Sequence, residues 1–506
     1  MRSRALLPAL LVAAVLAAYL PVLRYGATNW DDPVYTLDNP ALKGPAAAFS
    51  AARLGHYHPL SDLSLAAETR LFGERPGVHH AGNLLLHAAN AALAFFFLAA
   101  LLGSDAAAFL GAALWALHPL NVESAAWIAE RKNLLYAFFY LAALLAYLGP
   151  PSRRRLGAVS GLFLAALLSK ASAVTLPLAL LALDWLKGRP LDRRNLLEKG
   201  ALLAAALAFT LAAASAQGHM GRLLPGDFPA LFSFYLVKAV WPVSLSALYP
   251  YREALAALRA SPLLYTLPAA AFAGALALTV RKGPRGAAFG LLFFLINLLP
   301  FTLIVPVGPA LAADRYAYLP LLGLTLAAAA ALKTLYSGSR ARRAAAVALG
   351  AVCLCSAAAL ACARTAVWRS SGTLWTSVLG LYPESSVANL NMAHSLLERG
   401  DARAALPFLA TAVASDPDNP GALYDLGTLL ARAGRPAEAL PLLGRAVLAD
   451  PANAPAWNNL GLAELALGRP AEARKAFLTA AAADPGYAPA RANLEALEKA
   501  APAPRR

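Results

Sequence analysis

The sequence predicts an all-α membrane protein: a polytopic helical bundle of about eleven spans, followed by a soluble α-solenoid of short repeats. Three observations predict this class. The 506 residues are 59% hydrophobic and only 14% charged, which is too apolar for a soluble chain of this length. The formal net charge of +16 is concentrated in a few short loops. The last part of the chain repeats with a period of 34 residues.

Apolar runs of near-spanning length recur through the first 365 residues. We expect spans at approximately 5–23, 82–102, 106–122, 133–149, 156–169, 172–186, 200–216, 262–280, 287–305, 316–333 and 344–362. The first run follows two arginines, as a secretory signal does, but its length and the lack of a clean small-residue cleavage site before Arg24 favour a retained helix. All three cysteines lie in the last run, where we expect packing at lipid depth rather than a disulfide or a metal site.

Basic side chains mark one side of the membrane. They cluster at 153–155, 187–199, 281–285 and 340–343. Such clusters are typical of cytoplasmic loops, so we expect a cytoplasmic N-terminus and a C-terminal part outside the cytoplasm. A span at 231–249 would place the cluster 281–285 outside. We therefore interpret 231–249 as a re-entrant or interfacial helix, with Tyr249 and Tyr251 at headgroup level.

The C-terminal part is a repeat region. Pro383, Pro417, Pro451 and Pro485 recur every 34 residues, as do Gly400, Gly434 and Gly468. Small residues at 393, 427 and 461 pair with alanines twelve positions later, where two helices can cross closely. The pattern resembles tetratricopeptide repeats. We expect a membrane domain at 1–365, a linker at 366–385, and three repeats with a trailing helix at 386–499 that form a concave groove. Residues 383–506 carry 12 basic and 13 acidic side chains, so no basic stripe for nucleic acid is present.

The first outer loop carries the main acidic candidates. "NWDDPVYTLDNP" places Asp31 and Asp32 just after the first span. Pro33 favours an extended Asp32, so we expect the pair on non-helical backbone with the two carboxylates on opposite sides. A solvated turn with a capping Asp is the simpler alternative. We favour Asp31 as a base and Asp32 as a turn brace or metal ligand.

The other outer segments carry further polar candidates. His58 and His80 lie in histidine-rich stretches that suit the polar lining of a pocket, without the ligand spacing of a metal site. The second outer turn contains Glu123, Arg131 and Lys132, charges that are costly beside a membrane unless they are paired or functional. The last outer turn contains Asp314, Arg315 and Tyr316, and Arg315 suits a phosphate clamp, although a tyrosine belt with a local ion pair is the alternative.

These charges gather at loop ends, whereas the interiors of the spans are nearly free of ionisable groups. An ion-coupled transporter would need such groups at mid-membrane depth. A carboxylate with cations nearby suits a different chemistry. The carboxylate removes a proton from an acceptor hydroxyl, the hydroxyl attacks the anomeric carbon of a sugar, and a lipid phosphate leaves, stabilised by Arg or Lys.

A family resemblance covers nearly the whole chain. The stretches "NWDDPVYTLDNP", "YHPLSDLSL", "ALHPLNVESAAWIAERKNLL", "LLSKASAVTLPLALLALDWL" and "ADRYAYLPLLGL", followed by the repeats, resemble the transmembrane and tetratricopeptide-repeat-containing O-mannosyltransferases and their bacterial relatives. These are C-type glycosyltransferases that use lipid-phosphate sugars. The resemblance implies a catalytic acid at Asp31-Asp32 and basic positions at Arg131, Lys132 and Arg315.

Three positions depart from the family pattern. His58 stands where Arg is expected, Asn133 stands where Asp often follows the basic pair, and Lys170 lacks the acidic residue that follows it in eukaryotic members. These departures concern the donor sugar more than the reaction type.

The sequence therefore predicts an inverting membrane glycosyltransferase that moves a monosaccharide from a polyprenyl-phosphate donor to a protein Ser/Thr hydroxyl or another envelope acceptor. The expected catalytic residues are Asp31, Asp32 and Glu123, and the expected substrate-binding residues are His58, His80, Arg131, Lys132, Lys170, Asp314, Arg315 and Tyr316. No cofactor is assigned, and a divalent cation is left open. Expected partners are the lipid-linked donor, membrane lipid, and an acceptor protein bound by the repeats.

The alanine-rich, lysine-poor composition suggests a bacterial inner membrane with the repeats in the periplasm. Two other classes fit parts of the pattern. A membrane-anchored repeat scaffold would need one anchor rather than eleven spans. A lipid-linked sugar transporter would need charged residues on a path to the cytoplasmic side.

Overall fold

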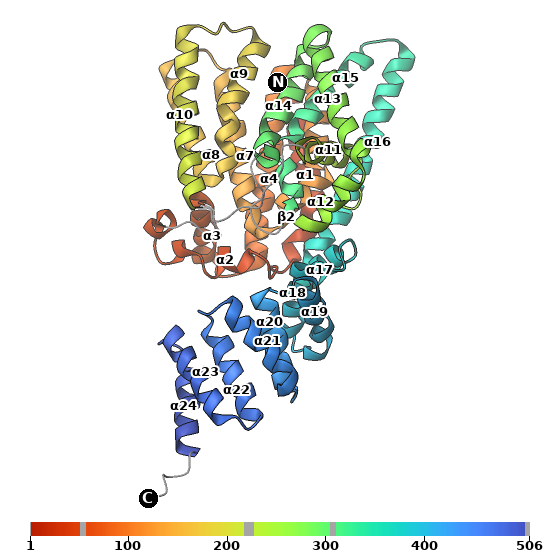
Figure 1. Ribbon diagram of the computed structural model, residues 1–506. Helices are drawn as coiled ribbons and strands as arrows, with labels where there is room; N and C mark the ends of the chain where they lie inside the picture. The colour runs from red at the N-terminus through yellow and green to blue at the C-terminus, as the bar shows by residue number, and fades with distance from the viewer. Residues whose placement is uncertain (1, 51–56, 217–226, 304–309, 501–506) are drawn as a thin grey trace, which may run out of the picture. The chain divides into compact units, whose positions relative to one another are not determined.

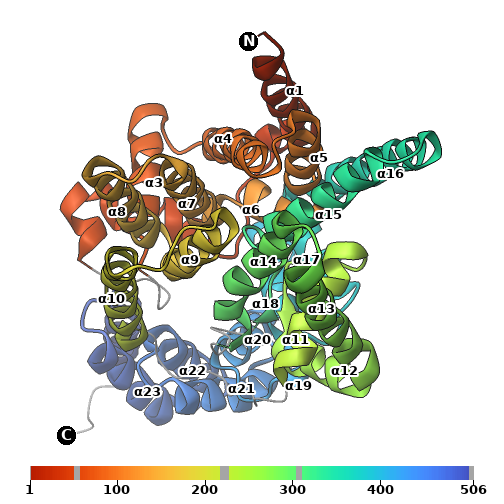
Figure 2. The same ribbon diagram turned by 90° about the horizontal axis from the view of Figure 1, so that it is seen from above.

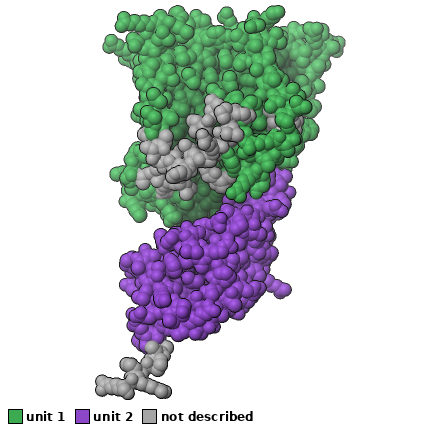
Figure 3. All heavy atoms as spheres, in the orientation of Figure 1, with its two compact units in different colours: residues 1–374 green, residues 375–506 purple. Residues whose placement is uncertain are grey.

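The computed structural model describes residues 2–50, 57–216, 227–303 and 310–500. The chain divides into two compact units, residues 1–374 and 375–506 (Figure 3). Within the described residues α-helices dominate both units, which confirms the predicted all-α class. The sequence did not predict the short antiparallel pair of β1 (Tyr249–Pro250) and β2 (Ala310–Ala312) in the first unit.

The helices of the first unit run from α1 to α16, and Figure 1 labels most of them. They are α1 (Arg2–Tyr19), α2 (Asp32–Thr36), α3 (Pro59–Phe72), α4 (Pro76–Leu102), α5 (Asp105–Ala116), α6 (Val122–Ala126), α7 (Arg131–Leu148), α8 (Arg153–Ser169), α9 (Leu176–Lys187), α10 (Arg193–Ala216), α11 (Asp227–Val240), α12 (Tyr251–Ala260), α13 (Pro262–Lys282), α14 (Arg285–Leu303), α15 (Leu321–Tyr336) and α16 (Arg340–Thr365). The expected linker 366–385 contains the 3-10 turn Ala366–Arg369 and all of α17 (Ser371–Leu379), and α17 crosses the unit boundary.

Several helices are apolar enough for a membrane. By length and composition, four of those described can span one: Leu6–Arg24, Pro76–Leu102, Arg285–Thr302 and Arg340–Arg369. Shorter apolar helices include α5 and α15. These helices indicate membrane association. The other segments predicted as spans are largely helical but do not meet both criteria, so the count of eleven is not established.

The predicted span at 106–122 is wrong at its end. The helix α5 ends at Ala116, and a 3-10 turn begins at Pro119. Proline has no N–H to donate and disfavours helical backbone at the residue before it, so the helix stops short. This break lets the following residues, 117–130, fold as a compact buried segment rather than as the end of a span.

The segment 231–249 also differs from its prediction. The helix α11 covers only its first part and ends at Val240, where Pro242 soon follows. Tyr249 does not lie at a surface: its side chain is buried, and its hydroxyl donates to Asp314 Oδ1 at 2.8 Å. The expectation that Tyr249 marks the headgroup level is therefore wrong, because this tyrosine satisfies a buried carboxylate instead.

Two glycines set the closest helix contact in the first unit. A β-carbon at Gly323 on α15 would lie 2.6 Å from the backbone nitrogen of Phe294 on α14, and closer still to the carbonyl oxygen of Gly290. The two helices therefore touch backbone to backbone, as small residues allow in membrane bundles. This contact fixes the start of α15, next to the turn that carries Asp314 and Arg315.

Different elements lie at the two ends of the first unit. In Figure 1 the N-terminus and the turn between α15 and α16 lie at one end, and α2 and α3 lie at the other. A buried polar cluster occupies the ends of α7, α9 and α10: the Tyr147 hydroxyl donates to Asp184 at 2.8 Å, and Lys199 pairs with Asp184 at 2.7 Å. Ionisable groups at these helix ends are thus paired rather than excluded, a detail that the sequence did not indicate.

The second unit is a stack of helical hairpins. Its helices after α17 are α18 (Ser386–Glu398), α19 (Ala402–Ser415), α20 (Pro420–Arg432), α21 (Pro436–Ala449), α22 (Ala454–Ala466), α23 (Pro470–Ala483) and α24 (Ala488–Ala500). The recurring glycines Gly400, Gly434 and Gly468 have φ between +75° and +79°, a backbone conformation that glycine tolerates best. The predicted repeats and the trailing helix are present, with α24 in the place expected for the trailing helix.

Candidate active site

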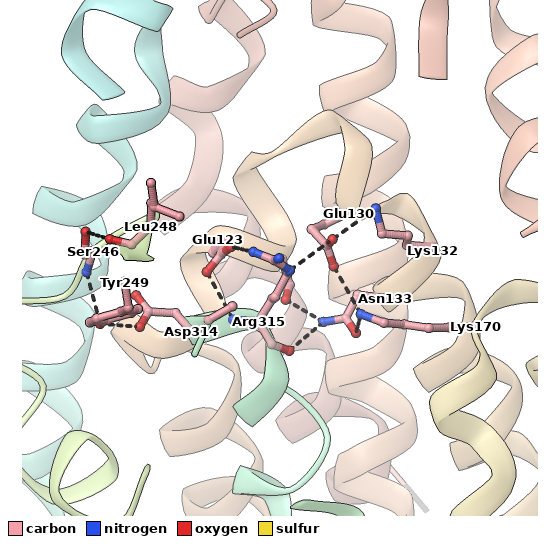
Figure 4. A network of polar contacts seen from close by, with 12 residues as sticks. Glu123, Glu130, Lys132, Asn133, Lys170, Ser246, Leu248, Tyr249, Asp314 and Arg315 are labelled. Atoms are coloured by element: carbon pink, nitrogen blue, oxygen red, sulfur yellow. Dashed lines mark hydrogen bonds and ion pairs between the residues drawn. The ribbon is translucent and has the colours of Figure 1, made fainter. Parts of the chain in front are cut away.

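Glu130 is the centre of a buried charge cluster (Figure 4). It is fully buried, and its carboxylate lies 3.2 Å from Lys132 Nζ, 3.4 Å from Lys170 Nζ and 3.5 Å from Arg315 Nε. Burial alone would raise the pKa of Glu130, but the three cations outweigh it and hold the pKa at about 2. Glu130 therefore stays ionised and fixes the three cations relative to one another.

Three separate segments deliver these cations. Lys132 lies in the first turn of α7, just after the buried segment 117–130. Lys170 follows the end of α8 in extended backbone. Arg315 lies in the 3-10 turn Asp314–Ala317, before α15. All three positions lie at or next to the ends of helices, where the sequence predicted that charges such as Lys132 and Arg315 gather.

Glu123 holds Arg315 in place. Glu123 Oε1 lies 2.5 Å from Arg315 Nη1, and its Oε2 accepts the Arg315 backbone N–H at 3.1 Å. Burial raises the pKa of Glu123, while Arg315 opposes the rise. Since both of its oxygens are used by one residue, Glu123 serves here as an anchor for the guanidinium.

Asn133 connects the cations from the side. Its Oδ1 accepts from Lys170 Nζ at 3.0 Å, and its Nδ2 donates to the Arg315 carbonyl at 3.0 Å. An amide can do both at once because it carries an acceptor and a donor, whereas an aspartate could only accept. Asn133, which departs from the family pattern, thus fits the contacts made in this chain.

Asp31 and Asp32 have different surroundings. Asp32 is buried, and its carboxylate accepts the Thr28 N–H at 2.7 Å, the Thr28 hydroxyl at 2.9 Å and the Ala129 N–H at 3.0 Å. It ties the first loop to the segment that ends at Glu130. In the described part of the chain the half-buried Asp31 carboxylate accepts no hydrogen bond.

Asp31 instead responds to the cation cluster. Burial raises its pKa, and the charges of Lys132 and Arg315 oppose the rise. For Asp32, burial raises the pKa to about 6 against the hydrogen bonds from Thr28 and Ala129. Asp31 is therefore a carboxylate whose pKa the cations influence and whose oxygens accept no hydrogen bond within the described residues.

The expected non-helical backbone for this pair is wrong. Asp31 has αR dihedrals as the N-cap of α2, and Asp32 is the first residue of that helix. Pro33 is compatible with this arrangement because proline fits the first turn of a helix, where its missing N–H has no intrahelical partner to lose. The N-cap position sets Asp31 one turn before Tyr35, whose hydroxyl accepts from Lys132 Nζ at 3.4 Å.

Arg131 lies in a different network from its neighbour Lys132. Its Nη1 and Nη2 pair with the two oxygens of Glu68 at 2.8 and 2.9 Å, and its Nε donates to Asn83 Oδ1 at 2.5 Å. A further N–H donates to the His79 carbonyl at 2.9 Å. The guanidinium of Arg131 is thus occupied by the protein, and the structure does not bring it to the Glu130 cluster.

The remaining predicted residues lie around this centre. Tyr316 stacks on Phe301 with ring centroids 4.4 Å apart, beneath Arg315 and Lys170. Asp314 points the other way, to Tyr249 and to Arg364 at 3.5 Å. His80 contacts the Gly26 carbonyl through Nε2 at 3.3 Å, and His58 is buried at the start of α3. The structure thus gathers Lys132, Lys170, Arg315, Tyr316 and Glu123, and leaves Arg131, His58 and His80 outside the Glu130 contacts.

The central residue, Glu130, is one of the closely spaced charges of the second outer turn, but it was not among the expected site residues. Glu130 lies between expected site residues in "AERKN", so its charge beside an arginine and a lysine was an available signal. Trp127 was missed as well: it is buried, stacks on Trp30 at 4.8 Å and lies 5.4 Å from the Arg315 guanidinium. A tryptophan in an apolar turn gives no such signal.

The cluster has the parts needed to hold an anion next to a base. Its three cations lie within 3.5 Å of one carboxylate, and Asp31 lies close enough for two of them to act on its pKa. Phosphate oxygens suit both guanidinium and ammonium groups. Among the residues that the structure describes, no group of three or more His, Cys, Asp or Glu side chains is placed to hold a metal ion.

Comparison with known protein families identifies tetratricopeptide repeats in the second unit. A tetratricopeptide-repeat profile matches residues 396–460 and 430–497. Solved structures with similar repeats include YrrB, "a TPR protein with an unusual peptide-binding site", at 17% identity, TM-score 0.23, and coverage of 44% of this chain and 98% of that chain. The first TPR of Spaghetti (RPAP3) bound to an HSP90 peptide is 20% identical, with TM-score 0.22 and coverage of 23% and 93%.

Curated relatives extend the comparison to particular proteins. The chain is 36% identical over 98 residues to protein O-mannosyl-transferase TMTC2 of Mus musculus, which covers 19% of this chain and 12% of that protein. It is 33% identical over 124 residues to protein O-mannosyl-transferase Tmtc1 of Drosophila melanogaster, which covers 24% and 14%. The chain thus matches only about an eighth of the length of these relatives.

Proposed function

We propose that the first unit is a glycosyltransferase that moves a monosaccharide from a polyprenyl-phosphate donor to a Ser/Thr hydroxyl of a protein, with Asp31 as the general base. The local likeness to proteins named O-mannosyl-transferases supports this class of reaction. The apolar helices support a lipid-linked donor, since such a donor is drawn from the membrane. The repeats support a protein acceptor, because stacked helical repeats present extended binding surfaces.

The proposed reaction is a single displacement. The acceptor hydroxyl loses its proton to Asp31, its oxygen forms a bond to the anomeric carbon, and the bond from that carbon to the phosphate oxygen breaks. The polyprenyl phosphate leaves with the electron pair, and Lys132, Lys170 and Arg315 stabilise its charge. Attack opposite to the leaving group inverts the anomeric centre.

One observation carries the proposal: Asp31 is the carboxylate at this cluster whose side chain no described residue binds. The oxygens of Asp32 are used by Thr28 and Ala129, and Glu123 binds Arg315. A general base needs a lone pair directed at the substrate and a pKa nearer to the working pH than that of a free aspartate. Burial raises the pKa of Asp31 in that direction.

The test is incubation of the purified protein with a panel of polyprenyl-phosphate sugars and a Ser/Thr peptide, scoring which donor is consumed and whether the peptide gains mass. We expect Asp31→Asn to lower transfer by about 10²–10⁴-fold, the range of general-base catalysis, with donor binding and thermal unfolding unchanged.

Asp32→Asn is the matched control. An amide in place of Asp32 would set its NH₂ group against one of the backbone N–H donors, so we expect a lower unfolding temperature as its main effect. Near-normal transfer by Asp31→Asn would remove Asp31 from the reaction and make Glu123 the leading base. If no donor is consumed while the repeats still bind envelope proteins, a membrane-anchored scaffold is the better account.

We further propose that the site lies outside the cytoplasm, at the periplasmic face of a bacterial inner membrane. The turns that build the cluster are those on the side opposite to the basic loops in sequence. A reporter fused to the C-terminus should be active only outside the cytoplasm. Activity confined to the cytoplasm would reverse this orientation.

A further inference from the structure

A hollow of about 290 Å³ lies between α5, α15 and α16, away from the Glu130 cluster. Small residues from all three helices contribute to its lining: Ala106, Ala107, Ala329, Ala346, Gly350 and Ala351. In Figure 2, α16 projects outward from the other helices of this unit, with α5 and α15 beside it. The hollow is therefore a groove on the side of the bundle rather than part of its core.

The walls of the groove are apolar, and they include larger side chains as well as small ones. Leu110, Leu332 and Leu354 add branched apolar side chains to the small ones. Val347, on its α16 wall, is 58% exposed. An exposed apolar wall of this kind on a helix that is apolar enough to span a membrane faces lipid tails rather than water.

The end of the groove carries positive charge. Lys333 and Tyr336 line it, and Arg343 lies over the Tyr336 ring at 5.4 Å. Arg340 and Arg342 belong to the same first turn of α16, which contains no acid. The sequence from 329 to 354 contains these four cations and no carboxylate, and the only acid of the nearby stretch 99–112 is Asp105.

We propose that this groove binds one anionic glycerophospholipid, with an acyl chain along the small-residue walls and the phosphate at the basic end. The site is separate from the proposed transfer reaction and does not depend on it. Basic pockets between membrane helices are suited to acidic headgroups, and each cation near a headgroup adds about 1 kcal/mol, or about fivefold in affinity. The apolar groove accommodates an acyl chain, so one phospholipid can fill the groove and place its phosphate at the basic end.

The combination of features favours a lipid over other anions. A free phosphate would use the basic end and leave the apolar groove without a role. A helix from another protein would need a longer apolar face than one hollow of this size provides. An acyl chain gains directly from filling it, because each buried methylene group adds about fourfold in affinity.

The test is native mass spectrometry of the full-length protein in detergent, titrated with phosphatidylglycerol and with phosphatidylcholine of the same acyl chains. We expect one phosphatidylglycerol to bind at least about fivefold more tightly than phosphatidylcholine. Val347→Trp should fill the groove, displace about two methylene groups, and weaken that binding about tenfold. Leu349→Trp is the matched control, because Leu349 is 51% exposed on the same helix but does not line the groove.

A second variant tests the headgroup. Arg343→Gln removes one exposed charge without touching a buried side chain, and should weaken phosphatidylglycerol about fivefold while leaving phosphatidylcholine unchanged. Equal binding of both lipids to the wild type, or equal effects of Val347→Trp and Leu349→Trp, would overturn the proposal. Unchanged binding by Arg343→Gln and Val347→Trp together would do so as well.

Discussion

At the scale of single residues, the cluster depends on which way neighbouring side chains point. Arg131 and Lys132 are adjacent, yet one pairs with Glu68 and the other with Glu130. Consecutive residues on a helix point about 100° apart, so two neighbouring cations cannot share one target. The sequence showed that both were placed at the start of an apolar helix, but not the rotation of that helix, which decides which of them reaches the site.

Lys170 provides a pH test of the cluster. Burial lowers the pKa of Lys170 to about 8, although the charge of Glu130 opposes the decrease. Its ammonium group is thus present below about pH 8 and is lost as the pH rises through that value. If this charge holds the donor phosphate, donor affinity should fall above pH 8, by at most about tenfold per pH unit.

Lys170→Arg is the control for that profile, because a guanidinium stays charged throughout the range. Donor binding is measured by calorimetry from about pH 6.5 to about pH 9.5, which is about one and a half units either side of the Lys170 pKa. Over this range donor affinity should fall in the wild type and stay constant in Lys170→Arg. Parallel profiles for the two proteins would exclude Lys170 from donor binding.

At the scale of elements, the contact between α14 and α15 positions the turn that carries Arg315. Gly323 lies against the backbone of α14, with no room for a methyl group. Gly323→Ala should push the helices apart and lower the free energy of unfolding by about 1–3 kcal/mol, the usual cost of overpacking. It should also lower donor affinity, since Arg315 lies a few residues before α15.

Gly161→Ala on α8 is the matched substitution, because a β-carbon there meets no other atom within 4 Å. Helix propensity alone predicts that this variant gains up to about 1 kcal/mol. Thermal unfolding of both variants in the same detergent separates the two effects. Equal unfolding temperatures for them would show that the α14–α15 contact tolerates a methyl group.

Element prediction succeeded where the signal was periodic or chemical. The 34-residue period located the repeats and the trailing helix of the second unit, and the charge pattern identified the turns that supply Lys132 and Arg315, whereas Lys170 came from the family resemblance. Element prediction failed where tertiary contacts determine the backbone conformation or the burial of a residue. Asp32 starts a helix because Thr28 and Ala129 hold its carboxylate, and Tyr249 is buried because Asp314 needs a donor. Ala129 lies 97 positions from Asp32 and Asp314 lies 65 positions from Tyr249, so local rules do not reveal these two contacts.

At the scale of the whole molecule, the proposed function assigns sugar transfer to the first compact unit and acceptor recruitment to the second. Deleting residues 386–499 should raise the apparent KM for a protein acceptor and leave donor hydrolysis unchanged, because the proposed donor site lies wholly in the first unit. The assay compares a protein acceptor with a short peptide that is too small to use the repeats. An equal loss of donor hydrolysis and of protein transfer would show that the repeats support the fold of the membrane unit instead.

The contacts of Asp32 bear on how this chain can be recombined with its relatives. Asp32 joins the first loop to the backbone of Ala129, one residue before Glu130. A chimera that receives only the first loop of a relative would contain one side of this contact from the relative and the other side from this chain. The two sides would then have to fit although they come from different proteins. Exchanging residues 28–36 together with 123–133 should preserve activity where either exchange alone fails. These two stretches are then best treated as one inherited module, although Asp32 and Ala129 lie 97 positions apart in the chain.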